Sequence, residues 1–341
     1  MISIGRLVFK ATGVMSKKGI VKNCKKVGQK VAEQMQKTGG KIDNSEIQQI
    51  LSDTIGKKAA SKIKITGDKE SFMQTCSKNL GLPDNIAEYV YNSSLSAAIP
   101  ARGNGALVNL RLASLPNTQI ANIASHELEH GLFYSFSSSA KMAKLLDKTS
   151  LGRKYINKVM KKAPVLNETG LILQQSLLSE IGNLGNSAVG FTKGSSALST
   201  LLEKSGCKSK KELQEKIRQM LYGKDIISVG KEKDNAFLLK NLISSLKDEK
   251  RAYATGAFSE KYWNNLLGKD LNGLVSKSEL NASLYGEAVK VLKQELLHTR
   301  LNQVKRFFGF KPKEARELAL IYEYRTKQIQ DFYKFMDSYN K

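Results

Sequence analysis

The residues best suited to chemistry lie in segment 120–133, where His126, Glu127 and His130 form the pattern H-E-x-x-H. On a helix, residues four apart share a face, so both imidazoles can point at a single ion. Two neutral histidines, a third protein ligand and an open water position make a catalytic zinc site. Glu127 would then be the general base that takes the proton from the water. The alternative is a helix whose two histidines are caps or core polar groups.

The motif is informative because the whole chain contains only three histidines, and two of them fall within it. The sequence before it predicts a strand pair. Segment 106–113 alternates apolar and polar residues like a half-buried strand, and the Gly-Asn-Gly in 102–105 indicates a hairpin with 96–101. Pro116 and Asn117-Thr118 then open the motif helix, with Asn117 or Thr118 as the expected N-cap.

A strand pair leading directly into an H-E-x-x-H helix resembles the zincin metallopeptidases, over roughly residues 62–136. In that superfamily the strand before the helix is an edge strand, on which an extended peptide docks by β-augmentation. The resemblance therefore implies that strand 106–113 holds a substrate. A metzincin would have a third histidine at position 136, but Phe136 stands there. The resemblance thus implies a gluzincin-like site, with a glutamate from a later helix as third ligand.

Two glutamates are candidates for the third zinc ligand. Glu249 interrupts the apolar stripe of a long helix expected over 234–263, and a buried carboxylate must be paired or metal-bound. Segment 248–253 also looks like the E-x-x-A segment of several zincin families, in which Ala252 permits close helix packing. Glu180, at the edge of an apolar helix face, is the rival ligand. The plain structural reading of Glu249 is a surface ion pair with Lys247 or Lys250.

Two further residues stay outside the predicted site. The thermolysin-like pattern has an aspartate that orients the first histidine, and Tyr253 occupies that position here, so His126 must be oriented by other means. Tyr253 is a candidate oxyanion donor, although core packing is the commoner role of such a residue. His298 is a candidate for the same role or for a fourth ligand, but a lone helical histidine is more often structural.

Composition bounds the class of protein. At 341 residues with 41% hydrophobic content, the chain can bury the core of a globular protein, as one large domain or two. No apolar run is long enough for a transmembrane helix. Cys24, Cys76 and Cys207 indicate neither a disulfide framework nor a cysteine metal site. The first ten residues do not form a cleavable secretory signal, so cytoplasmic residence is the default, with export by another route as the alternative.

The formal net charge of +24 favours anionic partners, namely nucleic acid, an anionic membrane surface or acidic proteins. The scatter of the lysines favours a plain solvated surface instead. Residues 1–41 are the most lopsided stretch, with ten basic residues and Glu33 as the single acidic one. They are interpreted as a basic N-terminal arm that is mobile and can contact acidic partners. The alternative is a basic amphipathic helix carrying Val21, Val27, Val31 and Met35.

The sequence as a whole predicts an α+β, mostly helical fold, with a small sheet packed beside the motif helix. After the arm come a zincin-like domain over 42–270 and a C-terminal helical hairpin over 271–341. Within the domain, the sheet and active-site helix cover 62–138, and a helical part with the third ligand covers 140–270. The expected function is a zinc-dependent peptidase acting on a peptide or protein, with an acidic substrate as a weaker inference. The alternative is a basic nucleic-acid- or membrane-binding helical protein with an incidental or inactive H-E-x-x-H.

Overall fold

The fold was obtained as a computed structural model. It describes residues 15–77, 84–93, 95–101, 105–137, 140, 145–146, 148–182, 189–228, 232–307, 321, 324–325 and 328. The described part is α+β and mostly helical, which confirms the predicted fold class. It forms two compact units, the first made of Met1–Lys161, Val189–Thr192 and Arg251–Glu279, and the second of Lys162–Ala188, Lys193–Lys250 and Leu280–Lys341.

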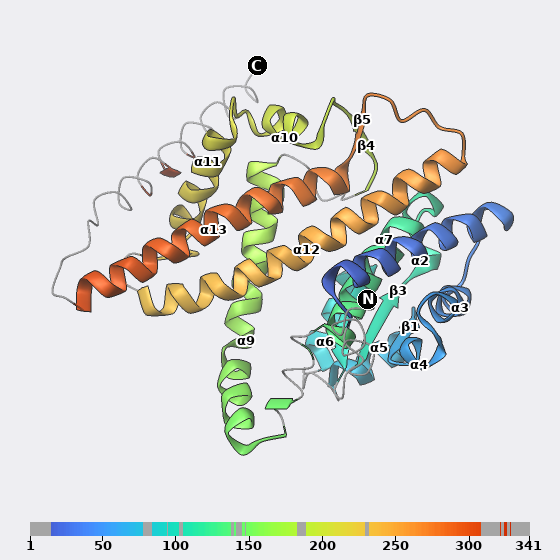
Figure 1. The fold of residues 1–341 in the computed structure, drawn as a ribbon, viewed down its shortest axis with the longest axis horizontal. Coiled ribbons are helices and arrows are strands. Elements are labelled where there is room, and N and C mark those ends of the chain that lie inside the picture. The colour runs from blue at the N-terminus through green and yellow to red at the C-terminus, as the bar shows by residue number, and fades with distance from the viewer. Residues whose placement is uncertain are drawn as a thin grey trace, which may run out of the picture. The chain divides into compact units, whose positions relative to one another are not determined.

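Each unit is built from several helices (Figure 1). Those that lie wholly in the first unit are α2 (Lys17–Lys37), α3 (Asn44–Ile55), α4 (Lys57–Ala60), α5 (Lys69–Thr75), α6 (Asp84–Ser93) and α7 (Asn117–Phe136). Those that lie wholly or partly in the second are α9 (Ser150–Ser176), the π-helical turn Leu177–Ile181, α10 (Ala197–Ser205), α11 (Lys210–Gly223), α12 (Glu232–Leu266) and α13 (Lys277–Phe307). The division therefore interleaves along the sequence and does not follow the predicted boundaries at residues 42 and 271. The second arm of the expected C-terminal hairpin falls mostly outside the described residues.

The main sheet has the strand order β1-β3-β2 and gives one correction. Its strands are β1 (Ile63–Thr66), β2 (Ser96–Ala101) and β3 (Gly105–Leu110). Strand β3 runs parallel to β1 and antiparallel to β2. The predicted docking strand 106–113 is thus the central strand, with both edges already paired, and it ends at Leu110 before a 3₁₀ turn. The predicted edge position was wrong, because β3 returns to pair with β1 after the intervening α5, α6 and β2.

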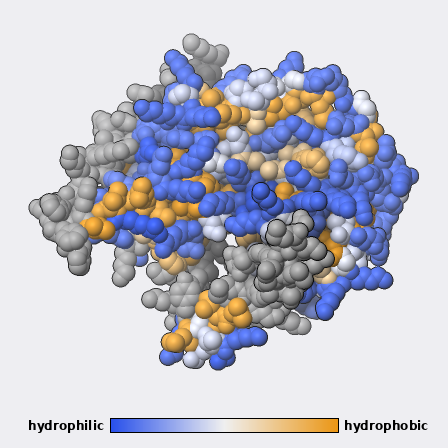
Figure 2. Space-filling view, viewed as in Figure 1, coloured by the Kyte–Doolittle hydropathy of each residue, from blue (hydrophilic) through white to orange (hydrophobic). Residues whose placement is uncertain are grey.

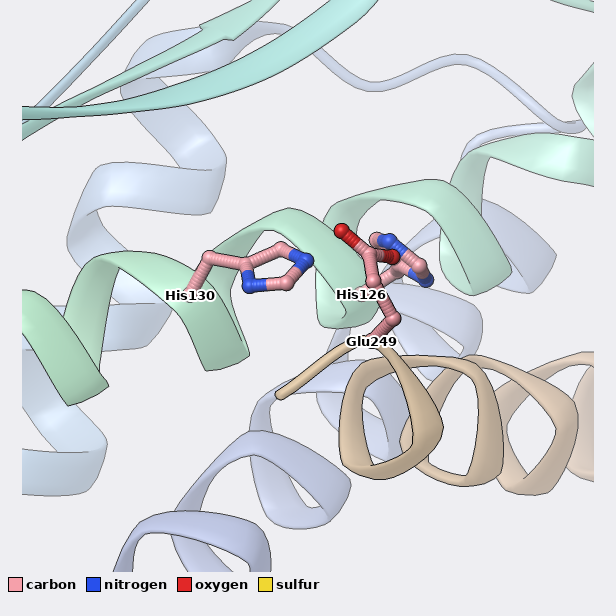
Figure 3. A group of neighbouring side chains, drawn as sticks. All are labelled: His126, His130 and Glu249. Carbon is pink, nitrogen blue, oxygen red and sulfur yellow. The ribbon is translucent and has the colours of Figure 1, made fainter. Parts of the chain in front are cut away.

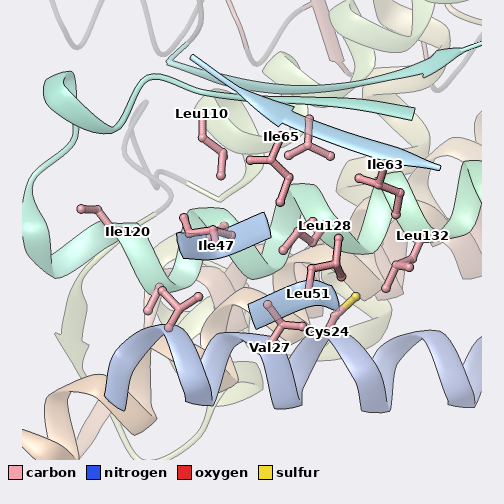
Figure 4. Close-up of a cluster of buried hydrophobic side chains, with 14 of the residues drawn as sticks. Cys24, Val27, Ile47, Leu51, Ile63, Ile65, Leu110, Ile120, Leu128 and Leu132 are labelled. Atoms are coloured by element: carbon pink, nitrogen blue, oxygen red, sulfur yellow. The ribbon is translucent and has the colours of Figure 1, made fainter. Parts of the chain in front are cut away.

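The core of the first unit lies between the sheet, α7, α2 and α3 (Figure 4). Ile63 and Leu110 come from the sheet, Leu128 from α7 and Leu51 from α3, all fully or nearly fully buried. Burying such side chains is the main driving force for folding, at about 25 cal/mol per Å² of apolar surface. The motif helix is therefore fixed on one side by a continuous apolar layer.

Helix α2 corrects the interpretation of residues 1–41 as a mobile arm. Ser16 caps the helix by accepting a hydrogen bond from the Gly19 N–H. One face of α2 is fully buried and consists of Ile20, Cys24, Val27, Val31 and Met35. These residues recur every three or four positions, so the amphipathic-helix alternative describes residues 17–37, and the excess of lysine lies on the other faces. Residues 1–14 lie outside the described part.

A buried polar network holds α12 to α7 within the first unit. The Glu260 carboxylate accepts hydrogen bonds from Asn122 Nδ2 at 2.9 Å, from Ser276 Oγ at 2.7 Å and from the Gly190 N–H at 2.6 Å. Gly190 and Ser276 belong to the short pair formed by β4 (Phe191–Lys193) and β5 (Leu274–Ser276), or flank it. Burial raises the pKa of Glu260 above its ordinary value, against the hydrogen bonds that lower it. One carboxylate therefore connects the motif helix, α12 and the second sheet.

Small residues let the three long helices of this unit approach closely. A Cβ atom added to Gly28 of α2 would lie 2.0 Å from Ser259 Oγ of α12 and 3.0 Å from Ser125 Cβ of α7. A Cβ added to Gly256 of α12 would lie 2.2 Å from Asn122 Oδ1. Any larger side chain at either glycine would push the helices apart.

Three further features concern the surface, the second unit and the cysteines. In the described part, no helix is both long and apolar enough to cross a membrane. The face drawn in Figure 2 is covered mainly by hydrophilic residues. In the second unit, Glu295 of α13 accepts hydrogen bonds from Arg218 and Tyr222, which ties α13 to α11. The three cysteines are free and buried.

We expect Glu260→Ala to destabilise the protein by about 2–4 kcal/mol, because it removes the carboxylate that accepts hydrogen bonds from the buried Asn122 and Ser276 side chains and from the Gly190 N–H. Urea unfolding measures this change. The control is Glu88→Ala, which removes an exposed ion pair with Lys69 and should cost below about 1 kcal/mol. Equal losses for both variants would contradict the structural role of the network.

The effect of Glu260→Ala on the free energy of unfolding should depend on pH, and the raised pKa of Glu260 fixes the sign. A raised pKa means that the folded protein holds the Glu260 proton more tightly than the unfolded chain does. The contribution of this group to stability therefore falls as pH rises above the ordinary glutamate pKa. The stability difference between wild type and Glu260→Ala should accordingly be larger at about pH 4 than at about pH 7.

Candidate metal centre

The two motif histidines lie one turn apart on α7. Helix α7 begins at Asn117, and its N-cap residue is Pro116. The predicted N-caps, Asn117 and Thr118, are therefore the first two residues of the helix itself. Its apolar face, including Ala124, Leu128 and Leu132, is buried in the core. The imidazole rings of His126 and His130 have their centroids 5.0 Å apart, at an interplanar angle of 69°. Both rings are therefore near enough to serve one ion, as the i, i+4 spacing predicts.

Glycine at position 131 brings this helix close to the sheet. A Cβ atom there would lie 2.8 Å from Val108 Cγ2 of β3. The residue directly after the second histidine thus permits the close packing of α7 on the central strand. This contact sets the depth of His130, which is buried, whereas His126 is half-buried.

The third side chain comes from α12. Within the first unit, Arg251 Nε donates to Glu129 Oε1 at 2.8 Å, and the Tyr253 ring meets the His126 ring edge-on with centroids 4.6 Å apart. Glu249 lies two residues before Arg251 on the same unbroken helix, so its place follows from these contacts. One ligand atom each of His126, His130 and Glu249 lies within 4.8 Å of the others (Figure 3). The half-buried Glu249 carboxylate points toward the two imidazoles from the facing helix.

A second group in the same region consists of Glu129, His130 and Asp248. Glu129 is fully buried and already forms an ion pair with Arg251. Two imidazoles and a carboxylate are also a donor set typical of catalytic zinc, whereas the second group has a single imidazole. The residues of the first group therefore fit zinc better. The neighbouring Glu129–Arg251 pair holds α12 against α7.

The other predicted candidates lie elsewhere. Glu180 forms an ion pair with Lys224 and accepts a hydrogen bond from Tyr324 Oη at 2.6 Å, in the second unit. His298 is a half-buried residue of α13 in the same unit. Neither belongs to the metal-binding groups of the described residues. Of the two rival third ligands, the structure brings Glu249, and not Glu180, to the motif.

Two tyrosines contact the histidines. Tyr253 packs edge-on against His126 and supplies a steric constraint on that ring, in the position where the thermolysin-like pattern has an aspartate. Tyr134 stacks on His130, with centroids 6.1 Å apart and an interplanar angle of 19°. Tyr134 was missed by the sequence analysis, although its spacing from His130 along the helix was a usable signal.

Glu127 has a partner that the sequence does not reveal. Its Oε1 accepts a hydrogen bond from Ser96 Oγ at 2.9 Å, and the Glu127 side chain is buried. Ser96 is the first residue of β2, which pairs with β3 alone among the described strands of the main sheet. The predicted general base is thus held at the start of an edge strand. No local pattern relates positions 96 and 127, so this contact depends on the fold.

Comparison of the chain with protein-family models, with curated proteins and with solved structures gives no match. The resemblance to zincins therefore stays a prediction from the sequence motif.

We expect Glu249→Ala to lower the zinc content of the purified protein well below one ion per chain, because it removes a ligand. Elemental analysis after dialysis measures this. Glu180→Ala is the matched control and should leave the zinc content unchanged, since Glu180 is engaged with Lys224 and Tyr324. Loss of zinc from Glu180→Ala alone would move the third ligand to the segment 177–181.

If Glu127 is the predicted general base, Ser96→Ala should reduce kcat about tenfold with little change in KM, because the Glu127 carboxylate loses the hydroxyl that orients it. Ser96→Thr retains the hydroxyl and should restore most of the rate. Hydrolysis of a fluorogenic casein provides the assay. An equal loss in both variants would indicate a packing role for Ser96 instead.

Proposed function

We propose that this protein is a zinc-dependent peptidase that hydrolyses peptide bonds. The observation that carries the proposal is the convergence of His126, His130 and Glu249 next to Glu127. Ligand atoms of two imidazoles and one carboxylate within 4.8 Å of one another match the three-ligand set of catalytic zinc, which leaves a position for water.

A zinc ion held there would supply a Lewis acid, which polarises a carbonyl and lowers the pKa of a water molecule. Glu127 acts as the general base, because its carboxylate lies one residue from a ligand and is held by Ser96. It takes the proton from the attacking water and passes it to the leaving amine as the carbon–nitrogen bond breaks. The products are a carboxylate and an amine, so no other reactant is required.

The substrate strand in this proposal is β2 rather than β3. An extended peptide binds by adding a strand to a sheet edge, and the central strand β3 has no edge to offer. Strand β2 starts at Ser96, whose hydroxyl contacts the proposed base, so a peptide paired with β2 would run beside Glu127. Pro100 within β2 fits an edge position, because proline is confined to edge strands and bulges.

We expect Glu127→Gln to lower the rate of casein hydrolysis by at least about 10²-fold, because the amide cannot act as a base. Zinc content should remain at the wild-type level, since Glu127 is not a ligand. Glu203→Gln makes the same chemical change at an exposed position of α10 and should leave the rate unaltered. Wild-type turnover by Glu127→Gln would show that the proposed chemistry is wrong.

A further inference from the structure

A basic groove runs along α2 in the first unit. Its volume is about 620 Å³, and its cationic lining consists of Lys17, Lys18, Lys22, Lys25 and Lys26 of α2 together with Arg251 of α12. The five lysines span nine residue steps of helix, or about 14 Å. An extended peptide of about four residues has the same length.

The positive charge of the groove is not neutralised locally. Within the described residues, none of these five lysines forms an ion pair, and the lining contains no acidic side chain. Arg251 differs, because it is paired with Glu129. Lys18, Lys22 and Lys26 are exposed on the outer face of α2, whose opposite face is buried in the core. The groove therefore presents a field that favours anionic ligands.

Aromatic rings contact two of the cations that line the groove, and Val21 adds an apolar side chain to the lining. Lys25 Nζ lies 4.6 Å from the centroid of the Phe258 ring, and Arg251 Cζ lies 4.4 Å from that of Phe133. The groove thus combines fixed positive charge with apolar surface, which suits side chains that carry a carboxylate on an aliphatic stem.

The groove is also linked to the metal centre. Arg251 stands two residues after Glu249 on α12, and its Nε binds Glu129, the residue before His130. Phe133, under the Arg251 guanidinium, follows His130 by one turn of α7. The groove and the two motif histidines are thus connected through Arg251 and its contacts with α7.

We propose that the groove binds an acidic segment of the peptide substrate, with glutamate or aspartate side chains facing Lys18, Lys22 and Lys26. This assignment of substrate class rests on the proposed peptidase function. A peptide is favoured over a nucleic acid because the groove adjoins residues proposed to hydrolyse peptides, and because its length matches a few peptide residues.

The test measures binding in Glu127→Gln, so that nothing is cleaved, with fluorescein-labelled hexaglutamate as probe and fluorescence anisotropy as readout. In this background, Lys18→Gln/Lys22→Gln/Lys26→Gln should weaken binding at least about tenfold at low salt. Lys37→Gln/Lys57→Gln/Lys58→Gln is the control, because it removes three exposed lysines of the same unit and changes the net charge equally. It should weaken binding less than about twofold.

Each outcome decides the proposal. Weakening confined to the groove variant supports it, whereas equal weakening in both variants, or no binding of the probe at all, overturns it. A fluorescein-labelled dT12 oligonucleotide tests the other class of polyanion. Groove-dependent binding of dT12 without binding of hexaglutamate overturns the proposal in favour of a nucleic-acid site. Thermal melting of both triple variants checks folding, and the assay requires neither zinc nor turnover, so it is separate from the test of Glu127.

Discussion

The close packing of α7 against α12 is the constraint on which the rest of the site depends. Neither helix alone carries the candidate metal-binding group, because α7 supplies two imidazoles and α12 supplies the carboxylate. Gly256 lets α12 approach Asn122, and Glu260 accepts a hydrogen bond from that same asparagine. The two contacts lie one turn before His126 on α7 and fix the spacing between the helices. A shift of either helix by a fraction of an ångström would change the distances among the ligand atoms.

Closer to Glu249, α7 and α12 are held together by an ion pair instead of by close backbone contact. Glu129 is fully buried on the core side of α7, where an unpaired carboxylate would be costly, and Arg251 of α12 neutralises it. Tyr253 then fills the space against His126. A hydrogen-bonded network at Glu260, an aromatic contact at Tyr253 and an ion pair at Arg251 thus follow one another along α12 toward Glu249.

Much of this site is encoded locally, and the remainder is not. The spacing of His126 and His130, and the place of Glu127 between them, could be predicted because helical periodicity acts within a single turn. Glu249 was open to prediction because a carboxylate within an apolar stripe requires a partner. The Ser96–Glu127 hydrogen bond and the central position of β3 depend on which strands pair. That pairing is decided by β1, which lies some forty positions from β3 along the chain.

Helix α2 shows a different limit of sequence-based prediction, because the same residues supported two interpretations, a mobile basic arm and an amphipathic helix. Counting charges favoured a solvated arm, whereas the spacing of Val27, Val31 and Met35 favoured an amphipathic helix. The burial of these three residues prevails in the fold, where Ile20 and Cys24 complete the buried face in place of Val21. The apolar period is the better guide where both signals occur, because the basic residues sit on faces that remain in water. The same helix therefore serves as a core element on one side and as the wall of the basic groove on the other.

The distance in sequence between His130 and Glu249 has a consequence for biosynthesis. A ribosome adds about 5–20 residues per second, so many seconds separate the synthesis of the two histidines from that of α12. If the proposed zinc site is the active centre, the nascent chain holds its two imidazoles during that interval without the carboxylate that completes it, and its affinity for zinc would be low. A peptidase of this design would stay hydrolytically silent while it is being made, and its activation would coincide with the docking of α12.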